Sequence, residues 1–124
     1  MIKRLLILLF LFYSCSSDNN SSTIIGNIDN KSKTKIFLIE ADSNNQPIII
    51  DSTNAIDGSF NFKREVFIPN INFIQVKGYT ANFPFVLEKG TIEIELYKDS
   101  IPSSTSYGTK SNDSFMEYKT KTKA

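Results

Sequence analysis

Cys15 is the residue whose surroundings most clearly predict covalent chemistry, and it is the only cysteine in the 124-residue chain. Lys3 and Arg4 precede an uninterrupted apolar run, residues 5–13, and Ser14 stands directly before the cysteine. A positive end, a short apolar core and a small residue before a cut are typical of a secretory signal segment. The run is too short for a transmembrane helix, which needs about 20 residues. We therefore expect export followed by cleavage.

The placement of Cys15 at the cut resembles a lipobox, in which the cysteine sulfur is diacylated and the cysteine becomes the new N-terminus. Phe12 and Tyr13 are bulkier than the residues usual in such a box. The alternatives are an unmodified cysteine in a plain secretory signal and an uncleaved anchor. We predict lipid attachment at Cys15 and a protein that is exported and lipid-anchored to the cell envelope, at the outer membrane facing the periplasm.

Other chemistry has little support. The chain has no histidine and no second cysteine, which excludes Ser–His–Asp and Cys–His catalysis, an intrachain disulfide and an ordinary zinc site. Glu93 and Glu95 share a strand face, but outward glutamates opposite an apolar stripe are usually solvated. Residues 51–58 resemble a calcium loop only superficially, because Thr53 and Ala55 stand where Asp or Asn is expected. We predict no catalytic residue, no metal, no cofactor and no enzymatic activity.

The charge balance limits the possible partners. The full chain has 14 Lys plus Arg against 13 Asp plus Glu, and Lys3 and Arg4 leave with the signal, so the mature chain is close to neutral. Nucleic-acid binding therefore has no support. The expected partners are the membrane, through the lipid anchor, and an envelope protein. An apolar ligand pocket is an alternative use of the phenylalanines, although alternation places most of them in a core: Phe37, Phe60, Phe62, Phe67, Phe73, Phe83, Phe85 and Phe115.

A period near two dominates the chain after the signal and indicates β-strands. The clearest case is residues 91–96, where Ile92, Ile94 and Leu96 share one face. Asp57-Gly58 predicts a tight hairpin, and Pro84 favours an edge strand. The predicted strands are residues 23–28, 35–40, 48–52, 59–63, 72–79, 83–88 and 91–96. We predict an all-β fold, an antiparallel β-sandwich or open barrel of about seven short strands with a short C-terminal helix.

Only the C-terminal segment departs from this period. Residues 111–113 offer a helix N-cap, and Phe115 and Tyr118 lie three apart on one face. Glu117 and Lys121 have the spacing of a helical ion pair. The predicted organisation is a signal peptide (1–14), a flexible tether (15–22), a β-sandwich accessory domain (23–110), and a short helix with a frayed tail (111–124).

Six short motifs occur in an order that resembles a known family: residues 25–28, 35–38, 50–52, 57–62, 85–92 and 106–118. It is the domain of unknown function found after the lipoprotein signal in many Bacteroidota thiol–disulfide interchange proteins, ahead of a thioredoxin-like domain. The last motif is similar to the family's Gly-Ser/Thr-x-x-Asn passage, where the β-domain meets a helix. The resemblance implies a β-rich accessory domain without assigned catalysis, and no redox cysteine carries over.

Three interpretations follow. The first is a lipid-anchored lipoprotein whose non-catalytic β-rich domain interacts with a partner at the envelope. The second is the N-terminal accessory part of a truncated envelope thiol–disulfide oxidoreductase whose thioredoxin-like domain is missing. The third, a glycan- or adhesion-type sandwich, predicts an exposed aromatic cluster.

Overall fold

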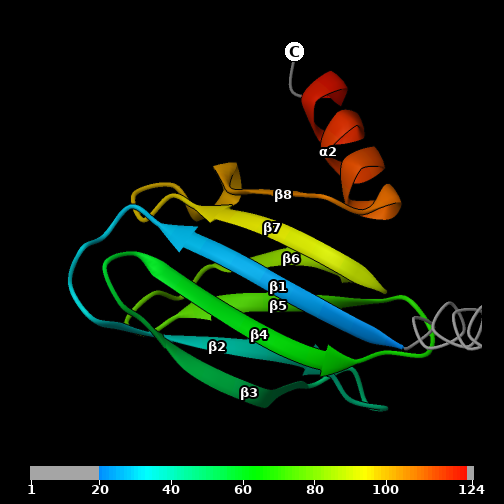
Figure 1. The fold of residues 1–124 in the computed structure, drawn as a ribbon, viewed down its shortest axis with the longest axis horizontal. Coiled ribbons are helices and arrows are strands. Elements are labelled where there is room, and N and C mark those ends of the chain that lie inside the picture. The colour runs from blue at the N-terminus through cyan, green and yellow to red at the C-terminus, as the bar shows by residue number, and fades with distance from the viewer. Residues whose placement is uncertain (1–19, 123–124) are drawn as a thin grey trace, which may run out of the picture.

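The computed structural model describes residues 20–122, which form two β-sheets packed face to face with a helix at one side (Figure 1). The first sheet has the strand order β4-β1-β7-β8 and the second has the order β3-β2-β5-β6. The predicted all-β sandwich is confirmed, and the sheets do not close into a barrel. The strands are β1 (Ser21–Ile28), β2 (Thr34–Ala41), β3 (Pro47–Ala55), β4 (Ser59–Glu65), β5 (Asn70–Val76), β6 (Asn82–Leu87), β7 (Gly90–Leu96) and β8 (Thr105–Tyr107).

The alternating apolar pattern correctly predicted which side chains enter the core. Ile92, Ile94 and Leu96 of β7 are buried, while Glu93 and Glu95 lie exposed on the outer face. Burying one such side chain stabilises a fold by about 1.5–3 kcal/mol. Other buried members of the single core cluster are Ile24, Ile28, Ile36, Leu38, Phe60, Phe62, Ile74, Val76, Phe83, Phe85 and Leu87.

Two features of the sheets differ from the prediction. The strands β1 and β7 pair in parallel, whereas every other strand pair is antiparallel. Alternation determines which face is buried but says nothing about a neighbour's direction, so this pair was not predicted. The eighth strand, β8, is only three residues long and its buried side chain is polar, Ser106. The sequence of β8 therefore lacks the alternating apolar pattern from which a strand can be predicted.

The predicted tight turn at Asp57-Gly58 is present, but the strands it connects, β3 and β4, belong to different sheets and do not form a hairpin. Ile56 and Ser59 exchange two backbone hydrogen bonds of 3.0 Å across the turn. Asp57 (φ 53°) and Gly58 (φ 82°) both adopt the left-handed conformation, as a type I′ turn requires. After the turn the chain passes from β3 in the second sheet to β4 in the first.

Strand directions give the sandwich two distinct ends. We call the end where β1 begins the proximal end. The loop from β4 to β5 (residues 66–69), the turn from β6 to β7 (residues 88–89) and the loop from β2 to β3 (residues 42–46) also lie there, at the right of Figure 1. The opposite, distal end carries the Asp57-Gly58 turn and the residues that follow Leu96.

The helix α2 (Lys110–Thr122) begins at the proximal end and follows a single 3-10 turn, η2 (Ile101–Ser103), and β8. The predicted ion pair between Glu117 and Lys121 is present at 3.1 Å. Met116 is buried against the core and Phe115 is partly buried, but Tyr118 is 65% exposed. Met116, rather than Tyr118, therefore takes the inward position on α2.

Element bounds also differ from the predicted ones. Ser21 and Ser22 belong to β1 rather than to a tether, and Ser22 is fully buried. At the other end, Lys119 is not frayed, since its Nζ donates to the Ser104 carbonyl at 3.1 Å and lies 5.4 Å from the Phe83 ring centroid. In residues 20–122 there is no helix with the length and apolar character needed to cross a membrane.

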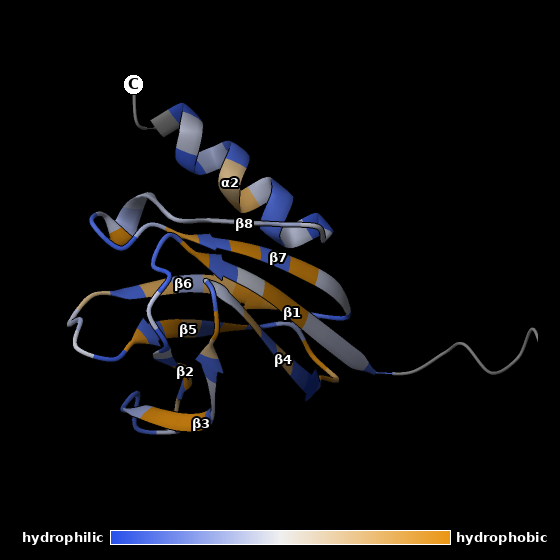
Figure 2. Cartoon of the chain, turned by 60° about the vertical axis from the view of Figure 1, so that its left-hand side comes forward, coloured by the Kyte–Doolittle hydropathy of each residue, from blue (hydrophilic) through white to orange (hydrophobic). Residues whose placement is uncertain are grey.

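Apolar residues are not confined to the space between the sheets. The edge strand β3 carries a continuous apolar stretch at residues 48–50, visible in orange in Figure 2. Ile48 is 42% exposed and Ile49 is 56% exposed. The other edge of this sheet is β6, where Pro84 lies, as predicted.

Candidate functional site

The residues considered for chemistry in the sequence lie in different parts of the chain. Cys15 lies outside the described residues. Glu93 and Glu95 are exposed on the outer face of β7, and residues 51–58 form the end of a strand and a turn. Asp51 contacts Arg64 at 3.9 Å rather than gathering with other carboxylates. Among residues 20–122 there is no group of three or more acidic, cysteine or histidine side chains that could hold a metal.

Five of the eight phenylalanines considered for an apolar ligand pocket lie in the core or pack against it. Four are buried between the sheets: Phe60, Phe62, Phe83 and Phe85. Phe37 and Phe73 are half-buried and Phe115 packs against the core. Phe37 and Phe73 lie outside the core cluster, and Phe67 is the most exposed of the eight, at 69%. The core interpretation is therefore confirmed for most of them, while Phe67 needs another explanation.

Phe67 belongs to a short loop at the proximal end, residues 66–69, which we call the proximal loop. Its neighbour Ile68 is 76% exposed, and Ile71 at the start of β5 is 51% exposed. Single exposed apolar residues are normal on a protein surface. Phe67 and Ile68 are adjacent in the chain, so together they form a small exposed apolar surface at the proximal end.

The proximal loop is held in place from both sides. Val66 is buried, and its N–H donates to the Asn20 carbonyl at 2.7 Å. On the other side, Pro69 restricts the preceding residue to extended conformations, and the Asn70 side-chain amide donates to the Ile68 carbonyl at 3.0 Å. Phe67 and Ile68 are thus presented to solvent by a fixed backbone.

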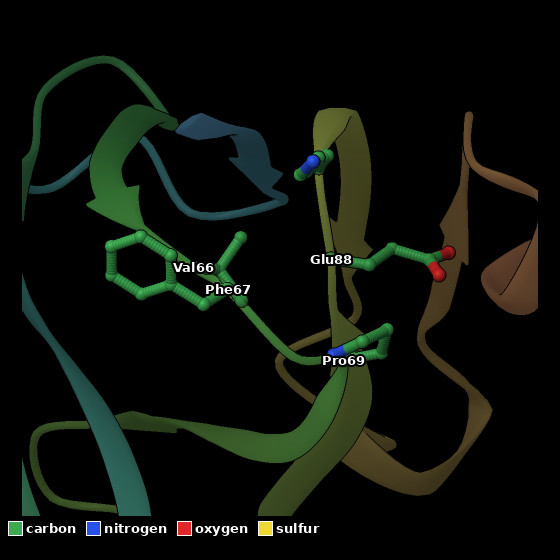
Figure 3. A pocket seen from close by; sticks show the side chains of 5 residues that line it. Val66, Phe67, Pro69 and Glu88 are labelled. Carbon is green, nitrogen blue, oxygen red and sulfur yellow. The ribbon is translucent and has the colours of Figure 1, made fainter. Parts of the chain in front are cut away.

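A hollow of about 310 Å³ opens beside this loop (Figure 3). Its lining combines the loop with the turn between β6 and β7. In Figure 3 the Phe67 ring and the Glu88 carboxylate point in opposite directions, so the acidic group is turned away from the apolar side chain. The lining residues are Val66, Phe67, Pro69, Glu88 and Lys89.

A second hollow, of about 460 Å³, lies at the same end of the sandwich. It is bordered by the first described residues of the chain and the last residues of β4, including two cations. The proximal end therefore combines exposed apolar side chains with basic ones. The lining residues are Asn20, Ser21, Lys63, Arg64 and Glu65.

Two buried polar atoms also lie near the proximal end. Within residues 20–122, the Ser22 hydroxyl and the Asn72 carbonyl oxygen are buried without a hydrogen-bond partner. Such groups cost roughly 1–3 kcal/mol each. Hydrogen bonding of the buried polar groups is therefore incomplete at this end of the sandwich.

Glu88 is used to hold the helix. Its Oε2 accepts a hydrogen bond of 3.0 Å from the Ser111 N–H in the first turn of α2, where the helix dipole favours an anion. Burial acts to raise the pKa of Glu88, but hydrogen bonds from Thr109, Ser111 and Asn112 together lower that pKa below its ordinary value of 4.5. This carboxylate is therefore engaged in structure and kept ionised.

Asn112 is the polar residue whose role the sequence did not reveal. Predicted as part of an N-cap, it is fully buried inside the first turns of α2. Its side chain accepts from the Val86 N–H (3.0 Å) and the Ser106 hydroxyl (2.9 Å). It also donates to the Val86 carbonyl (2.8 Å) and to Thr109 Oγ1 (2.7 Å). The amide thus pairs with the free edge of β6 as one residue of a neighbouring strand would.

The surrounding sequence, Gly108-Thr109-Lys110-Ser111-Asn112, fits the Gly-Ser/Thr-x-x-Asn passage, and the geometry explains it. Gly108 has φ 111°, and a Cβ there would lie 2.4 Å from the Thr91 carbonyl oxygen. Thr109 receives the Asn112 amide, and the intervening residues turn the chain into the helix. The passage therefore joins β8, β6 and α2.

Comparison with protein families is consistent with this fold. The model of a family described as a domain of unknown function, DUF4369, matches residues 22–115. The chain belongs to this family. The match runs from the second residue of β1 into the first half of α2. The DUF4369 domain therefore contains both sheets and the hydrogen bonds of Asn112 to β6 and β8, which we call the Asn112 clamp. No curated protein and no solved structure matches the chain.

The third interpretation, a glycan- or adhesion-type sandwich, predicts an exposed aromatic cluster. Phe67, Tyr97, Tyr107 and Tyr118 are exposed, but they come from four different segments of the chain. We take the proximal end, where the adjacent side chains of Phe67 and Ile68 are exposed, as the candidate site.

Proposed function

We propose that this protein is an exported lipoprotein, anchored through acylated Cys15, whose DUF4369 sandwich is a non-catalytic accessory domain of the cell envelope. The observation that carries the proposal is the lipobox-like placement of Cys15 so close to the first strand. Only residues 16–20 separate it from β1, and the six Cα–Cα steps from Cys15 to Ser21 span at most about 22 Å when extended. Two or three acyl chains at that site would provide stable anchoring.

A non-catalytic role is supported by the use of the polar groups. The best-connected side chains, Glu88 and Asn112, hold α2 against the sandwich. Their hydrogen bonds are made within the domain, which suits a stable interaction module. The expected partner is another protein of the envelope, and the expected location is the outer membrane facing the periplasm.

The anchoring proposal is tested by changing Cys15→Ala in the full chain. We expect loss of labelling by a radiolabelled fatty acid and release of the domain from the membrane fraction. The matched control is Ser14→Ala, which keeps a small residue before the cysteine and should leave labelling intact. Unchanged labelling of the Cys15→Ala protein would refute the proposal.

A second candidate is the N-terminal accessory part of an envelope thiol–disulfide oxidoreductase. It is favoured by the passage from Gly108 to Asn112, which directs the chain into α2 as in the resembling family. The DNA directly downstream tests it, in frame and in the other reading frames. A thioredoxin-like segment there would support this candidate over the stand-alone lipoprotein.

A further inference from the structure

We propose that the proximal loop rests on the surface of the bilayer that holds the Cys15 lipid, with Phe67 and Ile68 inserted into the interface. This inference rests on the proposed lipid anchoring and adds an orientation to it. The sandwich would stand with its proximal end on the membrane and its distal end, with the Asp57-Gly58 turn, pointing away.

The side chains suit an interface. Phe67 and Ile68 are 69% and 76% exposed, although both are large and apolar. Insertion of such groups to the level of the lipid headgroups removes apolar area from water. Because Val66, Pro69 and Asn70 already fix the loop, insertion would cost little ordering of the backbone.

The position of the loop in the fold carries the proposal. Val66 follows the end of β4, and its N–H bonds the carbonyl of Asn20, the first described residue. The loop is therefore beside the point where the chain arrives from Cys15. A tether of at most about 22 Å keeps this end of the domain near the lipid surface.

The charges around the loop are compatible with an anionic membrane. Lys63 and Lys89 are exposed at this end, and Arg64 is half-buried. Against them stand exposed Glu65 and half-buried Asp42, Arg64 lies 3.9 Å from Asp51, and Glu88 is turned away toward the helix. Basic residues next to an inserted apolar group are attracted by anionic headgroups.

A protein partner is the other occupant to consider for this surface. Stable protein interfaces bury about 800 Å² on each side, whereas the proximal loop offers two adjacent apolar side chains and a shallow hollow. A second, weak contact beside a covalent lipid needs much less area, because the anchor already holds the domain at the surface. The bilayer is therefore the occupant that the geometry favours.

The chain contains no tryptophan, so one substitution creates a unique fluorescent reporter. We would prepare the full lipidated chain with Phe67→Trp, and separately with Ile68→Trp, in vesicles of phosphatidylethanolamine and phosphatidylglycerol. The matched control is Tyr97→Trp, which places the reporter at a 40% exposed aromatic position at the distal end. Circular dichroism would verify that each variant keeps the fold.

Brominated acyl chains in the vesicles quench a tryptophan that reaches the interface. We expect a blue-shifted emission and about threefold stronger quenching for the two loop reporters than for the Tyr97→Trp control. Vesicle-bound protein with unquenched loop reporters would overturn the docking and leave the anchoring intact. Equal quenching at all three positions would overturn the orientation. Protein that does not stay with the vesicles would overturn the anchoring and the docking that rests on it.

Discussion

At the residue scale, Glu88 links ionisation to the attachment of the helix. Its carboxylate accepts the Ser111 N–H at 3.0 Å, and its pKa is lowered in the folded protein. The folded state therefore binds a proton on this group less readily than the unfolded state does. The stabilisation is present above the ordinary pKa and is lost as the pH falls through the folded-state pKa.

A Glu88→Gln variant should make stability less sensitive to acid. Between about pH 6 and pH 3, the wild type should lose more unfolding free energy than the variant, because only the wild type loses a charge–helix interaction. Urea unfolding at a series of pH values measures this. Glu93→Gln, on the exposed outer face, is the control and should keep the wild-type slope. Parallel curves for wild type and Glu88→Gln would show that the Ser111 contact makes no difference to stability.

Also at this scale, the sequence predicts charge pairs and strand alternation better than it predicts which helix residue faces the core. The Glu117–Lys121 pair and the outward glutamates of β7 were foreseen, because each depends on spacing within one element. The position of Met116 in place of Tyr118 depends on where the helix meets the sandwich. A local pattern does not contain that information.

At the scale of elements, Asn112 joins the helix to both sheets. It bonds both backbone groups of Val86 in β6 and the Ser106 side chain in β8. Free strand edges are sites of unwanted pairing, and this amide covers one position of such an edge. The clamp also explains why a helix of only 13 residues keeps its place, since short helices depend on tertiary contacts.

An Asn112→Ala substitution should lower the unfolding free energy by about 3 kcal/mol, since it leaves several buried polar groups without partners. Chemical denaturation with detection by circular dichroism measures the change. Asn61→Ala, at an exposed position of β4, should change stability by less than about 0.5 kcal/mol. Equal, small effects of the two substitutions would contradict the clamp.

Two features of the strands, the short strand β8 and the parallel pairing of β1 with β7, could not be predicted from the sequence. All seven predicted strands are present. They could be predicted because turn residues and two-residue alternation are local features of the sequence. The strand β8 was missed because its buried residue is a serine that bonds Asn112. The parallel pairing of β1 with β7 depends on the route of the chain through the second sheet between them. No local sequence pattern predicts that route.

At the scale of the whole molecule, the candidate site is defined by the segments that the fold brings together at the proximal end. Phe67 lies between the predicted strands 59–63 and 72–79, so alternation did not assign it to the core or to the surface. It became notable only when the fold placed it beside Asn20, where the chain arrives from Cys15. The exposed Ile68 in the same loop strengthens this observation.

The central claim is that Cys15 becomes the acylated N-terminus of the mature protein. Intact-mass analysis of the membrane-extracted chain, expressed from its full sequence, tests this most directly. We predict a species that begins at Cys15, 14 residues shorter than the 124-residue precursor, with the added mass of a diacylglyceryl group or of three acyl chains. A chain that still begins at Met1, or one that begins at Cys15 without added lipid mass, would contradict the account.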